Sequence, residues 1–378
     1  MLTLAFYPVD TWFFRESRPM ESLGGTSLGN QFPPSPSTLM GALRTRLGDL
    51  IGLNWQQLKQ QPDIAPPWWG DAEQPGDLKL IGPWLYIDNQ HYFPVPAHLL
   101  RQANGNGYVM LSPGKAVICD LGTVRLPTLP AQTSPGVKPL EGHWLEQQDL
   151  NRILQGEQPH PNMKTLCLDD LFENEYRLGI GMDTTSRSVI EGQLYQTRHL
   201  RPRKDLAVMV NLDGLDESIE QRLRDSLQQQ PLLRLGGEGR MAEVRVTSTP
   251  PAFRLPKQPR KQSCVMAIAL TDMPITKESW PLPGFTRMTD TEQGDYWQGT
   301  WVEQTMNLVA MATPKVHRQG GWDLLNHKPR AVRSFLPAGT VFFFNHATTL
   351  PSSLQIGSDT AWGYGHLVTG WWNDLLKG

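Results

Sequence analysis

The sequence predicts an α+β protein, on three observations. Strand-like runs outnumber helical patterns along the 378 residues. The clearest helices are separated by strands in the order β-α-β-β, which favours an α+β arrangement over a doubly wound parallel sheet. The 32 prolines and 34 glycines indicate long, loop-rich insertions between these elements.

The N-terminal elements are a strand and a helix. Residues 6–15 are strand-like and end in a charged turn. A proline-rich segment follows, and then an apolar stripe at helical spacing indicates a helix over 39–51. A Ser or Thr cap behind the prolines leaves the first N–H groups of this helix free to bind an anion such as an RNA phosphate. Arg44 and Arg46 flank the stripe, and we expect them to face solvent or RNA. This order is typical of the start of a ferredoxin-like, RNA-handling module.

The remaining elements are mostly strands. Asp88-Asn89 lies between two strand-like runs and is typical of a hairpin turn. A helix is predicted at 217–229. Strands are predicted at residues 78–87, 90–95, 207–212, 241–246, 265–270 and 340–344.

Two domains are expected, because a chain of this length can bury two cores. The segment 248–261, rich in proline and basic residues, separates a first domain at 1–250 from a second at 260–378. Within the first domain, residues 96–176 are predicted to be an insertion of irregular structure.

Composition excludes several classes of protein. No run of about 18 apolar residues is present, so no membrane span is expected. The N-terminus lacks the basic and apolar regions of a signal peptide. Cys119, Cys167 and Cys264 are odd in number and far apart. Disulfides and a zinc site are therefore not expected, and a cytoplasmic location fits.

Charge is unevenly distributed, although the net charge is only −2. Residues 61–176 carry 7 basic and 14 acidic side chains, whereas residues 177–261 carry 15 basic and 10 acidic ones. The densest basic cluster is 198–204. One face could therefore bind a polyanion while another contacts proteins. A solvated loop beside a strand explains the cluster equally well.

A glycine-rich loop at 236–240 is the sharpest local signal. Gly236, Gly237 and Gly239 let the backbone approach a ligand closely, and their N–H groups could form an anion nest beside Arg240. No Walker or dinucleotide-binding pattern is present. The alternative is a simple hairpin turn.

Two further segments combine basic and aromatic residues. Residues 178–195 are predicted to form a strand, a polar loop and a returning strand, where Arg187, Tyr195 and Arg198 would stack on bases and contact phosphates. Residues 314–323 join basic residues to a Gly-Gly-Trp turn and supply Lys315, His317, Arg318 and Trp322. An ordinary hairpin and an ordinary surface loop are the respective alternatives. The aromatic run at 362–372 favours buried packing over ligand stacking.

No catalytic pattern is evident. The nine histidines form no HExxH motif, and no GxSxG motif is present. We therefore expect no enzymatic activity, no metal and no cofactor.

Taken together, these segments resemble the RAMP superfamily of CRISPR proteins, and within it the third subunit of the type III-B (Cmr) effector complex. Their order along the chain carries the resemblance more than any single motif. The segments are 10–15, 32–44, 179–183 with 191–195, 236–240 and 362–365.

The resemblance implies two ferredoxin-like (RRM-like) domains and a subunit that is not the nuclease. It implies that the chain caps the 5′ handle of the crRNA and contacts the large polymerase-like subunit and the neighbouring RAMP backbone subunit. With the residue chemistry above, the expected RNA-binding residues are Arg44, Arg46, Arg187, Tyr195, Arg198, Gly236, Gly237, Gly239, Arg240, Lys315, His317, Arg318 and Trp322.

Three alternatives stay open. The first is a metal-independent crRNA-processing endoribonuclease of the same superfamily. Its general base would be His317, with Lys315 nearby to stabilise charge, or His199, with Tyr195 nearby in that role. The second is the equivalent subunit of a type III-A complex. The third is a loop-rich β protein with an unrelated binding function.

Overall fold

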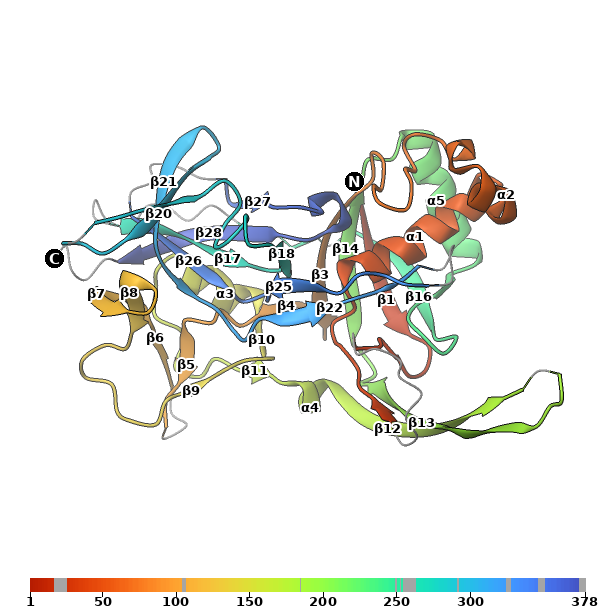
Figure 1. Ribbon diagram of the computed structural model, residues 1–378, viewed down its shortest axis with the longest axis horizontal. Helices are drawn as coiled ribbons and strands as arrows, with labels where there is room; N and C mark the ends of the chain where they lie inside the picture. The colour runs from red at the N-terminus through yellow and green to blue at the C-terminus, as the bar shows by residue number, and fades with distance from the viewer. Residues whose placement is uncertain are drawn as a thin grey trace. The chain divides into compact units, whose positions relative to one another are not determined.

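The computed structural model describes residues 1–16, 26–103, 107–183, 185–248, 250, 251, 253, 263–290, 292–323, 328–345 and 351–373. The protein is α+β, with several sheets and few helices (Figure 1). Contacts divide the chain into two compact units that alternate along the sequence. Unit 1 comprises Met1–Asn89, Leu168–Pro250 and Arg318–Arg333; unit 2 comprises Gln90–Cys167, Pro251–His317 and Ser334–Gly378. Residues 254–261 of the predicted linker lie outside the described residues.

Five antiparallel strands of an eight-stranded sheet form the centre of unit 1. In spatial order they are β3 (Lys79–Ile87), β14 (Ala207–Asp213), β1 (Leu2–Pro8), β16 (Met241–Thr247) and β15 (Leu232–Arg234). Leu4 on β1 lies opposite Val210 on one side and Val246 on the other. Strand β14 is apolar and buried along nearly its whole length, as expected for a strand covered on both faces.

Two helices cover this sheet. Helix α1 (Pro36–Leu50) contacts β3 and β15, helix α5 (Glu217–Gln229) contacts β16, and the two helices contact each other. Both therefore lie on one face. The predicted cap of α1 is Ser35, whose Oγ accepts a hydrogen bond from Thr38 N–H at 3.2 Å. The chain order β1-α1-β3-β14-α5-β16 maps onto the spatial order β3-β14-β1-β16.

The other elements of unit 1 lie outside this sheet. Strands β12 (Phe172–Met182) and β13 (Val189–Pro202) form a long hairpin, hereafter the arm, that projects beyond the rest of the unit (Figure 1). Strand β2 (Thr26–Leu28) pairs with β13. The remaining elements are α2 (Trp55–Gln60), η1 (Pro62–Ile64), α4 (Leu168–Leu171), β23 (Trp322–Asp323) and β24 (Lys328–Pro329), while β22 (His317–Gln319) starts at the junction of the units.

The main sheet of unit 2 has seven strands. Their spatial order is β19 (Thr286–Met288), β20 (Tyr296–Trp301), β21 (Gln304–Ala312), β26 (Val341–Asn345), β17 (Ser263–Ala269), β28 (His366–Asn373) and β27 (Ser353–Gln355). Four of these strands are, in chain order, β17, β21, β26 and β28. Their spatial order in the sheet is β21-β26-β17-β28. This repeats the strand order of unit 1.

Helix α3 (Gln147–Leu154) packs on β28 because a glycine makes room for it. A Cβ at Gly370 would lie 2.5 Å from the carbonyl oxygen of Leu154, so a side chain there would push the helix away. The apolar core of the unit contains Phe285, Trp301 and Phe344. Trp362 and Tyr364 are buried, which confirms the packing role predicted for the C-terminal aromatics.

Residues 90–167 of unit 2 are structured, so the prediction of irregular structure over 96–176 is wrong. They supply three strands of an eight-stranded sheet (β4, β10 and β11), a small three-stranded sheet (β6-β5-β9) and the hairpin β7–β8. The elements of this segment are β4 (Gln90–Pro94), β5 (Leu99–Arg101), β6 (Tyr108–Met110), β7 (Ser112–Cys119), β8 (Gly122–Thr128), β9 (Lys138–Pro139), β10 (Trp144–Glu146) and β11 (Thr165–Leu166). Three further short elements of the chain lie outside it: β18 (Met273–Ile275), β25 (Arg333–Leu336) and η2 (Thr360–Trp362). Most strands of the segment have only two or three residues, too few to show an alternating pattern.

The other predicted elements are confirmed, except that only residues 6–8 of the strand-like run at 6–15 belong to a strand, β1. Each of the six predicted strands corresponds to a strand of the structure, and α5 spans the predicted range. Asp88 and Asn89 both have positive φ, as a two-residue hairpin turn requires. The three cysteines are free. No helix in the described part of the chain is long and apolar enough to cross a membrane.

Candidate nucleic-acid interface

The segment that follows β1 is fixed against the base of the arm. Trp12 and Leu200 exchange two backbone hydrogen bonds of 2.8 Å, so residues 10–15 run beside β13. Asn30 holds the two segments together. Its Oδ1 accepts from Phe14 N–H at 2.7 Å, and its Nδ2 donates to the carbonyl of Arg198 at 2.7 Å. Trp12 is fully buried, which anchors the segment in the core.

The glycine-rich loop packs on the same segment. It connects β15 to β16, and its Gly237 N–H donates to the carbonyl of Phe13 at 2.8 Å. Gly236 has φ +87°, and a Cβ there would lie 2.5 Å from the same carbonyl oxygen. Only glycine fits at that position. The loop is therefore a hairpin turn, and the N–H groups of Leu235, Gly237 and Arg240 are used inside the protein rather than in an anion nest.

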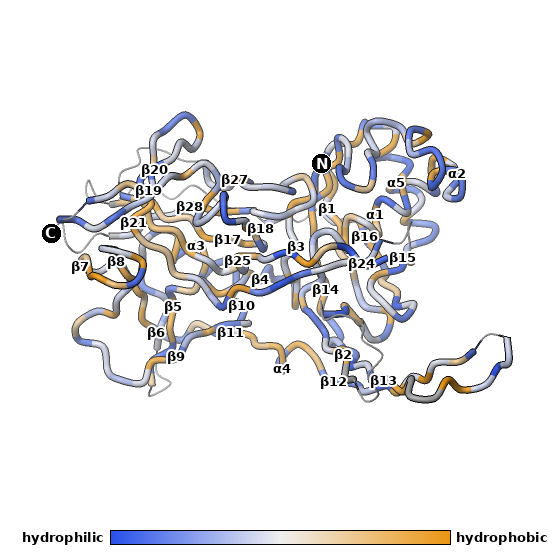
Figure 2. The backbone as a smooth tube through the Cα atoms, in the orientation of Figure 1, coloured by the Kyte–Doolittle hydropathy of each residue, from blue (hydrophilic) through white to orange (hydrophobic). Residues whose placement is uncertain are grey.

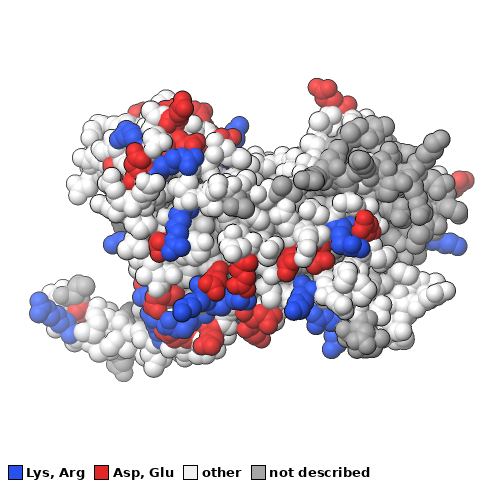
Figure 3. All heavy atoms as spheres, turned by 180° about the vertical axis from the view of Figure 1, so that it is seen from behind, with Lys and Arg blue, Asp and Glu red and all other residues white. Residues whose placement is uncertain are grey.

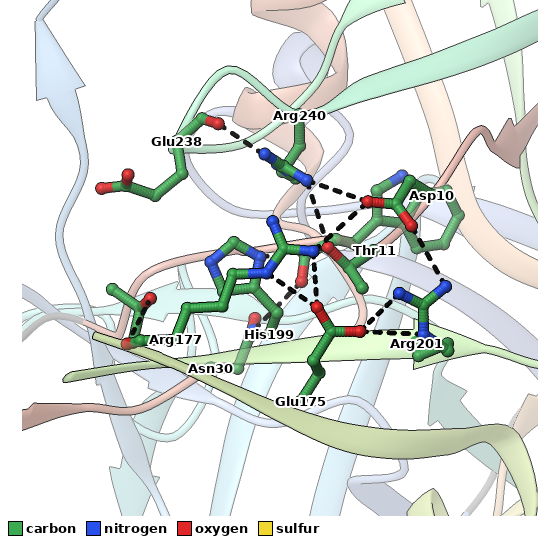
Figure 4. Close-up of polar contacts among 11 residues, drawn as sticks. Asp10, Thr11, Asn30, Glu175, Arg177, His199, Arg201, Glu238 and Arg240 are labelled. Atoms are coloured by element: carbon green, nitrogen blue, oxygen red, sulfur yellow. Dashed lines mark hydrogen bonds and ion pairs between the residues drawn. The ribbon is translucent and has the colours of Figure 1, made fainter. Parts of the chain in front are cut away.

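Three arginines surround the carboxylate of Asp10 where these segments meet (Figure 4). The donors are Arg177 Nη2 at 3.3 Å, Arg201 Nη1 at 3.1 Å and Arg240 Nη1 at 3.1 Å. They come from β12, β13 and the glycine-rich loop. We call Asp10, Glu175 and the three arginines the arginine cluster. The backbone N–H of Thr11 and hydrogen bonds from Arg177 and Arg201 hold the pKa of Asp10 below its usual value.

A second carboxylate completes the arginine cluster. Glu175 accepts hydrogen bonds from Arg177 Nε at 2.8 Å and from Arg201 Nε at 2.9 Å (Figure 4). Hydrogen bonds from Arg201 and Arg177 hold the pKa of Glu175 below its usual value. With both carboxylates ionised, three positive and two negative charges leave the cluster with a net charge of +1. Figure 3 accordingly shows basic and acidic side chains mixed near the base of the arm.

His199 lies beneath the arginine cluster and is 1% exposed. Its Nδ1 is 3.1 Å from Thr11 Oγ1, which also contacts Arg240 Nη1 at 3.3 Å. Arginine only donates, so the Thr11 oxygen accepts from Arg240, and the tautomer of His199 determines which of Thr11 Oγ1 and His199 Nδ1 donates to the other. Burial lowers the pKa of His199, and the charges of Arg177 and Arg240 lower it further. Both effects favour the neutral ring.

The arm has a charged and an apolar face near its base. Glu175 and Arg177 point to one side of β12, and the residues between and beyond them point to the other. Leu178 is 73% exposed. Figure 2 shows hydrophobic stretches on both strands. The exposed apolar side chains of the arm are Tyr176, Leu178, Ile180, Met182, Val189, Ile190 and Leu194.

The structure does not bring the predicted contacts on the arm together. Tyr195 pairs with Gly179 across the hairpin, and the absence of a side chain at Gly179 makes room for the ring. Arg198 pairs with Tyr176 and points to the opposite face. Its Nε is buried without a hydrogen-bond partner among the described residues. Arg187 is exposed in the turn at the tip.

Both arginines of α1 are engaged inside unit 1. Arg44 is 7% exposed, donates to the carbonyl of Asp71 at 2.7 Å and lies over the ring of Trp69. The prediction that it faces solvent or RNA is wrong. Burial lowers the pKa of Arg44 to about 10. Arg46 donates to the carbonyls of Gln230 and Leu232 at 2.8 and 2.9 Å, behind the end of α5.

The segment 315–322 is divided between the two units. Lys315 and His317 belong to unit 2, and Arg318 and Trp322 to unit 1. His317 Nε2 is 3.1 Å from Asp272 Oδ2. Burial would lower the pKa of His317, but the Asp272 carboxylate outweighs it and raises that pKa. The side chains of Lys315, Arg318 and Trp322 are exposed.

Sequence reasoning missed most of the arginine cluster. The basic run 198–204 contains Arg201, but no sequence motif indicates Asp10, Glu175 or Arg177 as a binding residue. One signal was available on β12, where Glu175 and Arg177 alternate with exposed apolar residues at a spacing of two. Nothing in the sequence indicates that Asp10 lies beside them.

The chain is similar to known proteins over most of its length. A family model described as "CRISPR-associated protein (Cas_Cmr3)" matches residues 4–372. A chain in a cryo-EM structure of type III-B Cmr-beta bound to cognate target RNA and AMPPnP is similar, with TM-score 0.50, 16% identity, and coverage of 90% of this chain and 86% of that one. A chain of the Csm3-Csm4 subcomplex of a type III-A interference complex gives TM-score 0.42, 11% identity, and coverage of 92% and 95%. No curated protein matches.

Proposed function

The chain belongs to the Cas_Cmr3 family of CRISPR-associated proteins, and from this we propose that it is a non-catalytic subunit of a type III-B CRISPR–Cas effector complex that binds and caps the 5′ handle of the crRNA. The geometry that supports RNA binding is the arginine cluster. It gathers guanidinium groups from three segments at the base of an apolar arm. Guanidinium groups are the preferred partners of phosphates, because their planar donors fit two oxygens at once.

We also propose that the chain contains two ferredoxin-like domains, within residues 1–250 and 260–378. The support is the shared strand order, in which the first of four strands lies between the third and the fourth. In unit 1 two helices connect these strands in the order β-α-β-β-α-β, the order of a ferredoxin-like domain. In unit 2 loops and short strands take the place of those helices.

The exposed apolar side chains support the protein contacts proposed for this subunit. In this proposal, the apolar side chains of the arm and of the hairpin β7–β8 contact the large polymerase-like subunit and the neighbouring RAMP backbone subunit. Ile118, at the tip of β7–β8, is 87% exposed, and Leu121 beside it is also exposed. Arg287 holds this tip in place by donating to the carbonyl of Leu121 while it pairs with Asp295. Exposed, fixed apolar residues favour protein docking over RNA binding.

The endoribonuclease alternative gains no support from the histidines. A general base must reach the 2′-hydroxyl of its substrate. His199 is buried, and its Nδ1 is occupied by Thr11. His317 is paired with Asp272 and stacks on Phe335.

The test is co-expression with a tagged large subunit and a crRNA, followed by RNA crosslinking and mass spectrometry. We expect crosslinks from the 5′ handle to peptides that contain Arg177, Arg201 or Arg240. Recovery with the large subunit but without handle crosslinks would leave a scaffold role and contradict the capping function. Failure to recover either partner would contradict membership of the complex.

A further inference from the structure

The arginine cluster holds the carboxylate of Asp10 between guanidinium groups from three segments. Three guanidinium groups converge on Asp10, each at hydrogen-bond distance. We propose that Asp10 occupies, in the free protein, the position of a backbone phosphate of bound single-stranded RNA, and that this phosphate displaces it. The inference rests on the proposed function and names the residues that receive the phosphate.

Asp10 is the replaceable member of the arginine cluster. It lies in the turn after β1, and its side chain is 46% exposed. Carboxylate and phosphodiester groups each present two anionic oxygens that guanidinium groups bind in the same way. Ion pairs at half-exposed positions contribute little to stability, so exchanging one anion for another costs little. Rotation about its own side-chain bonds is enough to move Asp10 out of the site.

The arginines keep their orientation when Asp10 leaves. Arg177 and Arg201 remain bonded to Glu175 through their Nε atoms. Arg240 Nε donates to the carbonyl of Glu238 at 3.1 Å. Each guanidinium therefore has a second anchor that does not depend on Asp10. With Asp10 displaced, three positive charges face a single carboxylate, and the cluster becomes a preformed anion site. Glu175 is then a positioning residue.

Two variants that each remove one negative charge test this assignment. Bulk electrostatics predicts that Asp10→Asn and Glu175→Gln tighten RNA binding equally. Our assignment predicts opposite effects. Asp10→Asn should tighten binding about threefold to tenfold, because it removes the competing anion. Glu175→Gln should weaken binding, because Arg177 and Arg201 lose their orienting partner. Both are measured by fluorescence anisotropy of the full chain with a labelled oligouridylate at constant ionic strength.

The outcomes are separable. If the wild-type chain binds the oligouridylate and Asp10→Asn binds no more tightly, the assignment of Asp10 is overturned and the proposed function stands. If the wild-type chain does not bind, both fall. Asp10→Ser repeats the test with a smaller side chain, so a folding defect in one variant does not decide the result. Displacement of the RNA by inorganic phosphate at the same ionic strength would assign the site to a free anion and overturn the assignment to a phosphodiester.

Discussion

Arg240 and Asp10 are 230 residues apart in the chain, and their side chains meet at 3.1 Å. One ends the glycine-rich loop and the other follows the first strand. In the chain, β1 is the first strand of the sheet at the centre of unit 1 and β16 is the last. The two strands are neighbours in the sheet, so a residue that follows β1 and the residue that precedes β16 can meet. The register of those two strands therefore determines whether the arginine cluster can form.

Replacement of Arg240 by Ala is expected to weaken RNA binding several-fold and to reduce the slope of log affinity against log salt by about 1, as expected for the loss of one phosphate contact. Arg245→Ala is the matched control. Arg245 lies on the adjoining strand and is ion-paired with Glu243 in the same way, but outside the arginine cluster. Anisotropy titrations at several salt concentrations measure both variants. Equal losses for the two would contradict a specific role for Arg240.

Two glycine substitutions are expected to have opposite effects on stability. Gly236→Ala places a Cβ against the carbonyl of Phe13 at a positive φ, and it should lower the free energy of unfolding by about 1–3 kcal/mol. Gly41 lies inside α1 with open space around it. Gly41→Ala should raise the free energy of unfolding by about 0.5–1 kcal/mol, because alanine restricts the unfolded chain. Urea unfolding of the two variants measures both, and a stable Gly236→Ala protein would contradict the packing described.

Arg44→Ala is expected to act on stability. The side chain is buried over Trp69, and its removal should cost about 2 kcal/mol of unfolding free energy through lost packing and an unpaired Asp71 carbonyl. Arg44→Met, which keeps most of the side-chain volume, should lose less. RNA affinity of the folded protein should be unchanged in both. A loss of affinity at full stability would restore Arg44 as an RNA contact.

Acid should destabilise the protein through His98. Burial lowers the pKa of this histidine from 6.5 to about 4. The folded state keeps the ring neutral, whereas the unfolded state takes up a proton below pH 6.5. The contribution of His98 to stability is therefore complete above that pH and decreases as the pH falls towards 4, by about 3 kcal/mol in all. Replacement by Leu should flatten the measured dependence of unfolding free energy on pH between these limits. An unchanged slope would show that the ring is hydrated.

Elements dominated by local pattern were predictable, and contacts between distant segments were not. The predicted strands and the helix at 217–229 have clear apolar periodicity. Arg44 shows where a pattern was misjudged. It lies one helical turn from Met40 and from Leu47, on the apolar stripe itself, so burial was inferable from spacing. The approach of Asp10 to Arg240 depends on strand order, which no local pattern records.

The alternation of the two units along the chain has a consequence for biosynthesis. The sheet at the centre of unit 1 is complete once residue 247 has left the ribosome. Residues 318–333, which belong to the same unit, are made only after Pro251–His317 of unit 2. Unit 1 therefore stays incomplete while residues 251–317 of unit 2 are translated. A nascent chain truncated after residue 250 would have every strand of that sheet and would still lack a part of unit 1.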